Sequence, residues 1–443
     1  MERRIRLLVG CCAALVAACA TTVSPPPSSP SATVLAPSTT PAALPSSTSG
    51  PPLSPTSSPL PSAPLVVDEG MPSMVVPPSA IKMAPIPDSP GVPAGGTPTG
   101  PYAYLPSIGN RTLWVVDAGG GSERAIPLPL AADEQMDEVR TDGSWIVVVV
   151  SGPATPGASE NGLTCSQQEE QPRAWRILAA PLGADGLPSG SFQKIDAGVA
   201  RRAFEAPGSA GLDCPFPATP PVALAAHEVA YAVEASGAAS TILVRPLPTG
   251  SFGLTYARTY ASPMVVYQIA LSPTAVAWSE TANGLTNGPT PDWRVMTASI
   301  MSGTPHQVPL GVVAGPAHDT LPSLLLDGNA VIASLDQFSG VSGTVVRVNG
   351  DTVETVDPGH ANRQCAAVGA EGGLVLLSCN GTTMSGDVAT GSRSWVAVWS
   401  ASSGLRALSD GTAMGIEAGW AVWTGWDASG HVVLHGVPLS ALR

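Results

Sequence analysis

The sequence predicts an all-β fold, a seven-bladed β-propeller behind a long disordered stalk, with six blades as the alternative. From residue 101 onward, short β-branched or aromatic runs alternate with turns rich in Gly, Pro, Asn and Asp, and no helical pattern of useful length occurs. A hairpin-like unit also recurs at intervals of roughly 40 to 55 residues, apart from one longer gap that an insertion explains. Repeats of this length with three or four strands each are typical of propeller blades.

Each hairpin unit consists of an apolar run, a short turn and a second apolar run. The copies are VRTDGSWIVVVV (139–150), VALAAHEVAYAV (222–233), IALSPTAVAWSE (269–280), LLLDGNAVIASL (324–335) and the weaker AVGAEGGLVLLSC (367–379) and IEAGWAVWTG (416–425). A third strand follows each copy, and a partial unit, YAYLPS with TLWVVDAG, precedes the first and completes the count of seven. The last unit has no obvious fourth strand, and we expect the N-terminal segment to supply it.

The loops fall into two classes, because turns inside the hairpin units are short and connections that enter or leave the units are long. In an antiparallel meander both kinds of long connection emerge on one face of the disc, so that face is the candidate binding surface. The long connections are 151–172, 199–219, 281–291, 312–322, 357–364 and 380–392.

The N-terminus has the pattern of an export signal, with arginines at positions 3, 4 and 6 followed by an apolar stretch from Leu7 to Ala18. This stretch is too short to span a bilayer. It ends in Val16-Ala17-Ala18-Cys19, which resembles the lipobox of bacterial lipoproteins. The resemblance implies that Cys19 is acylated and becomes the mature N-terminus, anchoring an extracytoplasmic protein to the cell membrane. The alternative is an ordinary signal peptide with a chance cysteine.

Composition divides the rest of the chain into a linker and a domain. Residues 20 to about 64 are dominated by Ser, Thr, Pro and Ala, which cannot build a core, so we expect a disordered tether. Residues 65–100 stay Pro-rich but gain apolar pairs such as Val75-Val76, and part of this stretch is expected to dock on the domain. The predicted divisions are therefore a signal at 1–19, a linker at 20–100 and a propeller at 101–443.

The net charge of −13 at pH 7 limits the possible partners. Nucleic acid and anionic lipid head groups both require an electropositive protein face, so neither is expected to bind non-specifically. We expect a monomer with no cofactor and no bound metal.

Four cysteines remain after the signal and the lipidated residue are set aside, and an even number in an oxidising compartment predicts two disulfides. Cys365 opens the first strand of its hairpin and Cys379 closes the second, so the two lie opposite each other. Cys165 and Cys214 fall in two long connections on one face, which predicts the second pair. No Cys-x-x-Cys or Cys/His cluster with zinc spacing occurs.

The architecture is similar in outline to the bacterial WD40-like and TolB-like propeller families over residues 101–443. Trp426-Asp427 and Gly359-His360 are the dipeptides used by WD40 repeats, but neither falls at the position or spacing of those repeats. The resemblance is therefore architectural, and it assigns no functional residue to this chain.

Candidate ligand residues are few. Most of the ten tryptophans lie inside strand runs, where packing between blades is expected, and only Trp293 and Trp426 lie at strand ends near long loops. Arginines in the long connections of an acidic protein could hold an anionic partner. The candidate ligand-binding residues are Trp293, Trp426, Arg201, Arg202, Arg363, His318 and Asp319.

These observations favour a cell-surface binding or scaffold module for an extracellular protein, peptide or envelope glycan. The alternative is a propeller hydrolase or lyase that acts on polysaccharide with acids from Asp213, Asp292, Asp319 and Asp387. No Gly-x-Ser-x-Gly elbow is present, and adjacent carboxylates are no evidence for the facing pair that a glycosidase needs. A third possibility is a structural envelope protein.

Overall fold

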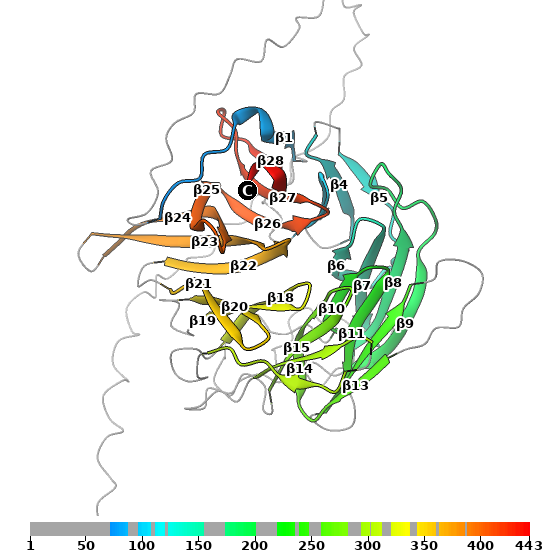
Figure 1. The fold of residues 1–443 in the computed structure, drawn as a ribbon. Helices are drawn as coiled ribbons and strands as arrows, with labels where there is room; N and C mark the ends of the chain where they lie inside the picture. Colours follow the sequence, from blue (N-terminus) through cyan, green and yellow to red (C-terminus); the bar gives the residue numbers. More distant parts are fainter. Residues whose placement is uncertain are drawn as a thin grey trace, which may run out of the picture. The chain divides into compact units, whose positions relative to one another are not determined.

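The computed structural model describes fourteen stretches of the chain (Figure 1). They are residues 71–86, 96–107, 111–119, 123–154, 173–200, 219–234, 239–247, 258–281, 294–301, 303–311, 320–336, 343–359, 363–385 and 388–443. Contacts divide the chain into units of residues 1–59 and 60–443, and all described residues belong to the second. The predicted signal, Cys19 and the stalk up to residue 70 lie outside the described residues.

The described residues form seven antiparallel sheets of four strands each, as predicted for a seven-bladed propeller (Figure 1). Blades 1 to 3 consist of β2 (Thr97–Thr99), β3 (Tyr102–Pro106), β4 (Leu113–Asp117) and β5 (Arg124–Ile126); β6 (Gln135–Thr141), β7 (Trp145–Pro153), β8 (Arg173–Pro181) and β9 (Gln193–Ala200); and β10 (Val222–Ala225), β11 (Glu228–Glu234), β12 (Ser240–Pro246) and β13 (Arg258–Ser262). Blades 4 and 5 consist of β14 (Val265–Leu271), β15 (Ala275–Thr281), β16 (Arg294–Ser299) and β17 (His306–Gln307); and β18 (Thr320–Asp327), β19 (Ala330–Asp336), β20 (Thr344–Asn349) and β21 (Thr352–Asp357). Blades 6 and 7 consist of β22 (Arg363–Glu371), β23 (Leu374–Ser385), β24 (Val388–Ser400) and β25 (Gly404–Asp410); and β26 (Thr412–Glu417), β27 (Trp420–Trp426), β28 (Val432–Pro438) and β1 (Lys82–Pro85).

The seven blades close into a ring. The first strand of each blade contacts the first strand of the next, and β26 of blade 7 contacts β2 of blade 1. The buried apolar side chains form seven clusters in the described part of the chain, and each cluster combines strands of two neighbouring blades. The core is therefore a series of interfaces between blades, which explains the nearly continuous apolar runs of the strands.

Blade 7 joins the two ends of the domain. Its strands β26, β27 and β28 come from the C-terminal part, and β1 pairs with β28 from Lys82 opposite Gly436 to Pro85 opposite Val433. Ala84 is buried between this blade and blade 1. The expectation that the N-terminal segment supplies the missing fourth strand is confirmed. Both β1 and β2 lie upstream of Pro101, within the stretch expected to dock in part.

The predicted hairpin units are the first two strands of blades 2 to 7. Five of these first strands, β6, β14, β18, β22 and β26, contain a break in register against the second strand. Such bulges bend a strand and increase its twist. They suit strands at the narrow centre of a propeller, where neighbouring blades converge.

The short turns between first and second strands lie on one side of the propeller, here called the hairpin-turn side, and carboxylates link some of them. Asp142, after β6, accepts a hydrogen bond from the His227 amide in the turn of blade 3 (3.0 Å). Asp327, at the end of β18, accepts bonds from the amides of Gly372 (3.0 Å) and Gly373 (2.8 Å) in the turn of blade 6. Each bond satisfies a backbone donor at a turn and ties one blade to the next.

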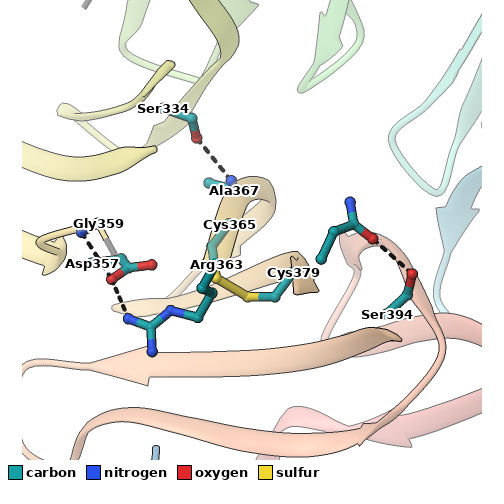
Figure 2. Close-up of a disulfide and its surroundings, with 9 residues drawn as sticks. Ser334, Asp357, Gly359, Arg363, Cys365, Ala367, Cys379 and Ser394 are labelled. Atoms are coloured by element: carbon teal, nitrogen blue, oxygen red, sulfur yellow. Dashed lines mark hydrogen bonds and ion pairs between the residues drawn. A yellow bond between two sulfur atoms is a disulfide. The ribbon is translucent and has the colours of Figure 1, made fainter. Parts of the chain in front are cut away.

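A disulfide joins the first two strands of blade 6 (Figure 2). Cys365 and Cys379 are directly opposed in the β22–β23 pairing, with their Cα atoms 4.1 Å apart, and both side chains are buried. This distance matches the closer class of opposed residues in antiparallel pairs. The predicted Cys365–Cys379 link is confirmed, whereas Cys165 and Cys214 lie outside the described residues.

Helical structure in the described part is limited to two short 3₁₀ turns, η1 (Pro78–Ala80) and η2 (Leu439–Ala441). Among these residues there is no helix with the length and apolar character needed to cross a bilayer.

Candidate functional site

A pocket of about 650 Å³ lies on the hairpin-turn side at blade 6. Its volume is within the range of natural ligand sites. Four separate segments line it: Ser73, Met74 and Val75; Gly372, Gly373 and Leu374; Ser400, Ala401, Ser402, Ser403 and Arg406; and Ala441, Leu442 and Arg443. We call residues 71–86 the strap and this cavity the strap pocket.

The strap forms one wall because it adds a short parallel bridge to the outer strand of blade 6. The Met74 amide donates to the Ala407 carbonyl oxygen (2.6 Å), and the Ala407 amide donates to the Pro72 carbonyl oxygen (3.0 Å). Met71 is buried in the cluster between blades 5 and 6 and fixes the start of the strap. From there the strap continues to β1 in blade 7, so it spans two neighbouring blades.

The β24–β25 turn forms a second wall and is ordered by serine hydroxyls. Ser400 Oγ accepts a hydrogen bond from the Ser403 amide (3.1 Å) and lies 2.7 Å from Ser403 Oγ and 3.1 Å from Ser402 Oγ. Gly404 follows with φ of 67°, in the left-handed region that favours glycine. Arg406 Nε donates to the Ser403 carbonyl oxygen (3.3 Å), which directs this guanidinium toward the turn.

The electrostatic character of the strap pocket differs from that of the chain as a whole. No Asp or Glu side chain is among the described residues that line it, although the chain carries a net charge of −13. Most arginines in the described part of the chain form an ion pair with a carboxylate. For Arg406 and Arg443, no carboxylate side chain of a described residue lies within ion-pair distance. The pocket therefore holds two guanidinium groups that no side-chain carboxylate of a described residue pairs with.

Two carboxylates that contact the turns of blades 6 and 7 are already engaged by other groups. Both oxygens of Asp327 accept backbone amides, and Arg347 lies 3.9 Å from this carboxylate. Glu371 Oε2 accepts a hydrogen bond from the Gly419 amide in the turn of blade 7 (3.0 Å). Arg443 Nη2 donates only a long bond to the Gly372 carbonyl oxygen (3.4 Å). The remaining guanidinium donors suit an anionic ligand.

Arg363, a predicted ligand residue, lies at the start of β22 and is buried rather than presented at the surface. Its Nη2 atom is 2.7 Å from Asp357 Oδ1, and that oxygen also accepts the Gly359 amide at 3.2 Å (Figure 2). The Asp357 side chain is fully buried. The ion pair therefore fixes the connection from blade 5 to blade 6 next to the disulfide, and it leaves this guanidinium inaccessible to a partner.

Trp426 is the predicted ligand residue that the structure places at the surface, with 57% of its area exposed. It ends β27, and the following loop is closed by Asp427 Oδ1, which accepts the amides of Ser429 (2.8 Å) and His431 (2.9 Å). These backbone bonds hold the pKa of Asp427 below its usual value. No described residue of the strap pocket belongs to this loop, so Trp426 is not part of that site.

The other predicted site residues lie outside the described residues. They are Trp293, Arg201, Arg202, His318 and Asp319, together with the candidate acids Asp213, Asp292 and Asp387. Much of the long-loop face falls outside as well. The described part of the chain contains no group of three or more His, Cys, Asp or Glu side chains arranged to hold a metal ion.

A buried carboxylate in blade 4 illustrates why burial alone does not identify a catalytic acid. Glu280 is 1% exposed, and it accepts hydrogen bonds from Trp278 Nε1 (2.7 Å), Arg294 Nε (2.6 Å) and Ser262 Oγ (2.5 Å). Three donors from β13, β15 and β16 satisfy this charge, so Glu280 ties blades 3 and 4 together. These contacts explain the burial of the Glu280 carboxylate without a bound substrate.

Two titratable groups in blade 7 have strongly displaced pKa values. Burial lowers the pKa of His435 to about 4, and its ring stacks on Trp423 with centroids 5.3 Å apart. Burial and the nearby carboxylates of Glu371 and Asp142 raise the pKa of Glu417 to about 8. Neither residue lines the strap pocket. Both values follow from packing within the ring, so they concern stability rather than ligand binding.

Sequence reasoning did not find the strap pocket. Its four lining segments are far apart in the sequence, and none carries a motif. The serine-rich turn at residues 400–403 followed by Arg406 is the only local signal, and serines in a turn are ordinary.

Comparisons with known proteins assign the chain to no family. No family model matches the chain, and no curated protein matches its sequence. Among solved structures, the chain is similar to an acylaminoacyl peptidase of Pyrococcus horikoshii (10% identity, TM-score 0.37, 65% of this chain and 42% of that one). It is also similar to a prolyl endopeptidase (10%, TM-score 0.47, 79% and 48%) and to YCF48 bound to D1 peptide (10%, TM-score 0.43, 83% and 97%). The chain thus spans less than half the length of either peptidase. At these identities the likeness concerns the β-propeller fold alone.

Proposed function

We propose that this chain is a lipid-anchored binding protein of the bacterial cell envelope, whose propeller captures an anionic group of its partner in the strap pocket. The observation that carries the proposal is that Arg406 and Arg443 line one pocket whose described lining residues include no Asp or Glu. In a chain of net charge −13, an unneutralised pair of cations at one cavity gives an anion a specific place to bind. Arginines elsewhere in the propeller that are buried or ion-paired do not offer an anion such a binding place.

Membrane anchoring through Cys19 is a separate part of the proposal. It is supported by the small residues before Cys19 and by the basic and apolar segments that precede them. Acyl chains on one cysteine would hold the protein at the membrane, and the Pro/Ser/Thr-rich stretch would carry the propeller outward. Metabolic labelling with a fatty-acid analogue should mark the wild-type protein and leave Cys19→Ala unlabelled. Equal labelling of both would exclude acylation at this residue.

The binding site is tested by thermal unfolding of the full chain with acetate or inorganic phosphate at constant ionic strength. A ligand that binds only the folded state raises Tm, so both anions should stabilise the wild-type protein. The double variant Arg406→Gln/Arg443→Gln should lose this response. Lys194→Gln, which removes an exposed cation of blade 2, is the matched control and should keep it. An equal response of the double variant and wild type would reject the strap pocket as the anion site.

A further inference from the structure

We infer that the strap pocket receives the end of a polypeptide, with the terminal α-carboxylate on Arg406 and Arg443 and an aliphatic last side chain against the strap. This inference rests on the proposed function and names the ligand class for the same site. It combines the charge of the pocket, the chemistry of its apolar wall and the hydroxyls between them.

Arg406 provides a fixed partner for a carboxylate. Its Nε bond to the Ser403 carbonyl oxygen ties the side chain to a turn that Ser400 orders through three hydroxyl contacts. The two terminal nitrogens of the guanidinium remain, and their planar pair of donors matches the two oxygens of a carboxylate. Arg443, exposed and joined to the Gly372 carbonyl oxygen by a long bond (3.4 Å), adds a second and more adaptable positive charge.

The apolar wall is aliphatic. Met74 and Val75 of the strap line the cavity together with Leu374 of β23 and Leu442 near the C-terminus, whose side chains are largely buried in the cluster between blades 6 and 7. Val75 is 92% exposed, so its side chain is accessible to a ligand. The described residues that line the pocket include no aromatic side chain, and sugar rings are typically held by stacking on aromatic faces. An aliphatic side chain fits this wall better than a sugar does.

The serine hydroxyls give the pocket contacts for a peptide backbone. Ser73 of the strap and Ser402 of the β24–β25 turn both line the pocket, and a hydroxyl can both donate and accept a hydrogen bond. A peptide end needs both, because its amides donate and its carbonyls accept. The cavity of about 650 Å³ has room for a few residues rather than a folded surface.

The experiment uses the full chain and a fluorescent six-residue peptide of glycine and serine that ends in leucine with a free carboxylate. The same peptide with an amidated end is the first comparison, and a peptide ending in glycine is the second. Fluorescence anisotropy should show the free acid binding at least tenfold more tightly than the amide. Arg406→Gln should weaken binding of the free-acid peptide at least tenfold, and Lys194→Gln should leave its affinity unchanged.

The apolar wall is tested independently by Val75→Ser, which alters an exposed side chain and is not expected to disturb folding. This variant should weaken binding of the leucine-ended peptide and leave the glycine-ended one unaffected. Equal binding of acid and amide would overturn the inference, as would a peptide affinity unaffected by Arg406→Gln. If acetate and phosphate still stabilise the wild-type protein through the two arginines while no peptide binds, the peptide assignment fails and the anion site stands. If neither small anions nor peptides separate wild type from the double variant, both proposals fail.

Discussion

Protonation of His435 is expected to destabilise the propeller as the pH falls below neutrality. The imidazole lies in β28, stacks on Trp423 of β27, and its Nδ1 atom has no hydrogen-bond partner among the described residues. Burial lowers its pKa from 6.5 to about 4, so the folded state holds the neutral ring at a pH where the unfolded chain binds a proton. The stabilising contribution is complete above pH 6.5 and is lost as the pH falls toward 4.

The displaced pKa sets the size of the effect. At about 1.4 kcal/mol per pKa unit, the full loss of unfolding free energy is about 3 kcal/mol, of which about 2 kcal/mol appears between pH 7 and pH 5. His435→Phe keeps an aromatic ring against Trp423 and removes the titration. Its packing beside Gly425 changes absolute stability, so the pH dependence is the informative quantity.

Urea unfolding followed by tryptophan fluorescence, at pH values from 7.5 to 4.5, compares wild type with His435→Phe. The difference in unfolding free energy between them should change by about 2 kcal/mol between pH 7 and pH 5. His431→Gln, at an exposed position, should follow the wild type. A difference between wild type and His435→Phe that stays constant over this range would refute the reasoning.

Three further changes test the ring. Replacing both Cys365 and Cys379 by serine should lower the unfolding free energy by about 3 kcal/mol, because the link closes a loop with a sequence separation of 14; urea midpoints equal to those of the wild type would contradict this. Glu417→Gln should raise stability progressively from pH 5 to about pH 8, by at most about 3 kcal/mol at pH 7, since a carboxyl whose folded-state pKa is raised to about 8 keeps its proton where the unfolded chain has ionised; a gain at pH 5 equal to that at pH 8 would exclude titration as the cause. Ala84→Glu should destabilise blade 7 strongly because Ala84 is 1% exposed, whereas Met83→Glu on the same strand, at a 40% exposed position, should have little effect; similar thermal unfolding of the two variants would show that β1 is not needed to close the ring.

Strands long enough to show an apolar or β-branched residue pattern could be predicted from the sequence. The second strands of the blades are long and β-branched, as in the run Val147 to Val150, and their turns are explicit. Strands such as β5, β17 and β2 have only two or three residues, too few for a periodic signal. Pro98 further hides β2, although a proline is acceptable there because this first strand has a hydrogen-bonded neighbour on one side only.

The disulfide of blade 6 could be predicted because it depends on local register. Cys365 and Cys379 are placed by a single hairpin, so counting residues from its turn was enough. The environment of Arg363 could not be predicted in the same way. Its partner Asp357 ends the preceding blade, and their contact depends on how the connection between blades turns back.

The candidate site was beyond sequence reasoning for a related reason. The strap pocket exists only after the ring has brought residues near 73, 373, 402 and 442 together. That no described Asp or Glu pairs with Arg406 is likewise a property of the fold, because acidic residues outnumber basic ones in the sequence. Residues this far apart in the sequence meet only because the ring closes, so no local sequence motif predicts their contact.

Ring closure through β1 also sets an order of events in folding. Residues 82–85 must pair with residues 433–436, so the first strand of the folded domain has no partner until nearly all of the chain is present. Contacts of such high sequence separation form slowly, and until then β28 keeps an unpaired edge. At high concentration, β1 of one molecule could pair with the unpaired edge of β28 in another. Two or more chains linked by exchanged first strands are therefore the misassembled product to expect when this protein is refolded.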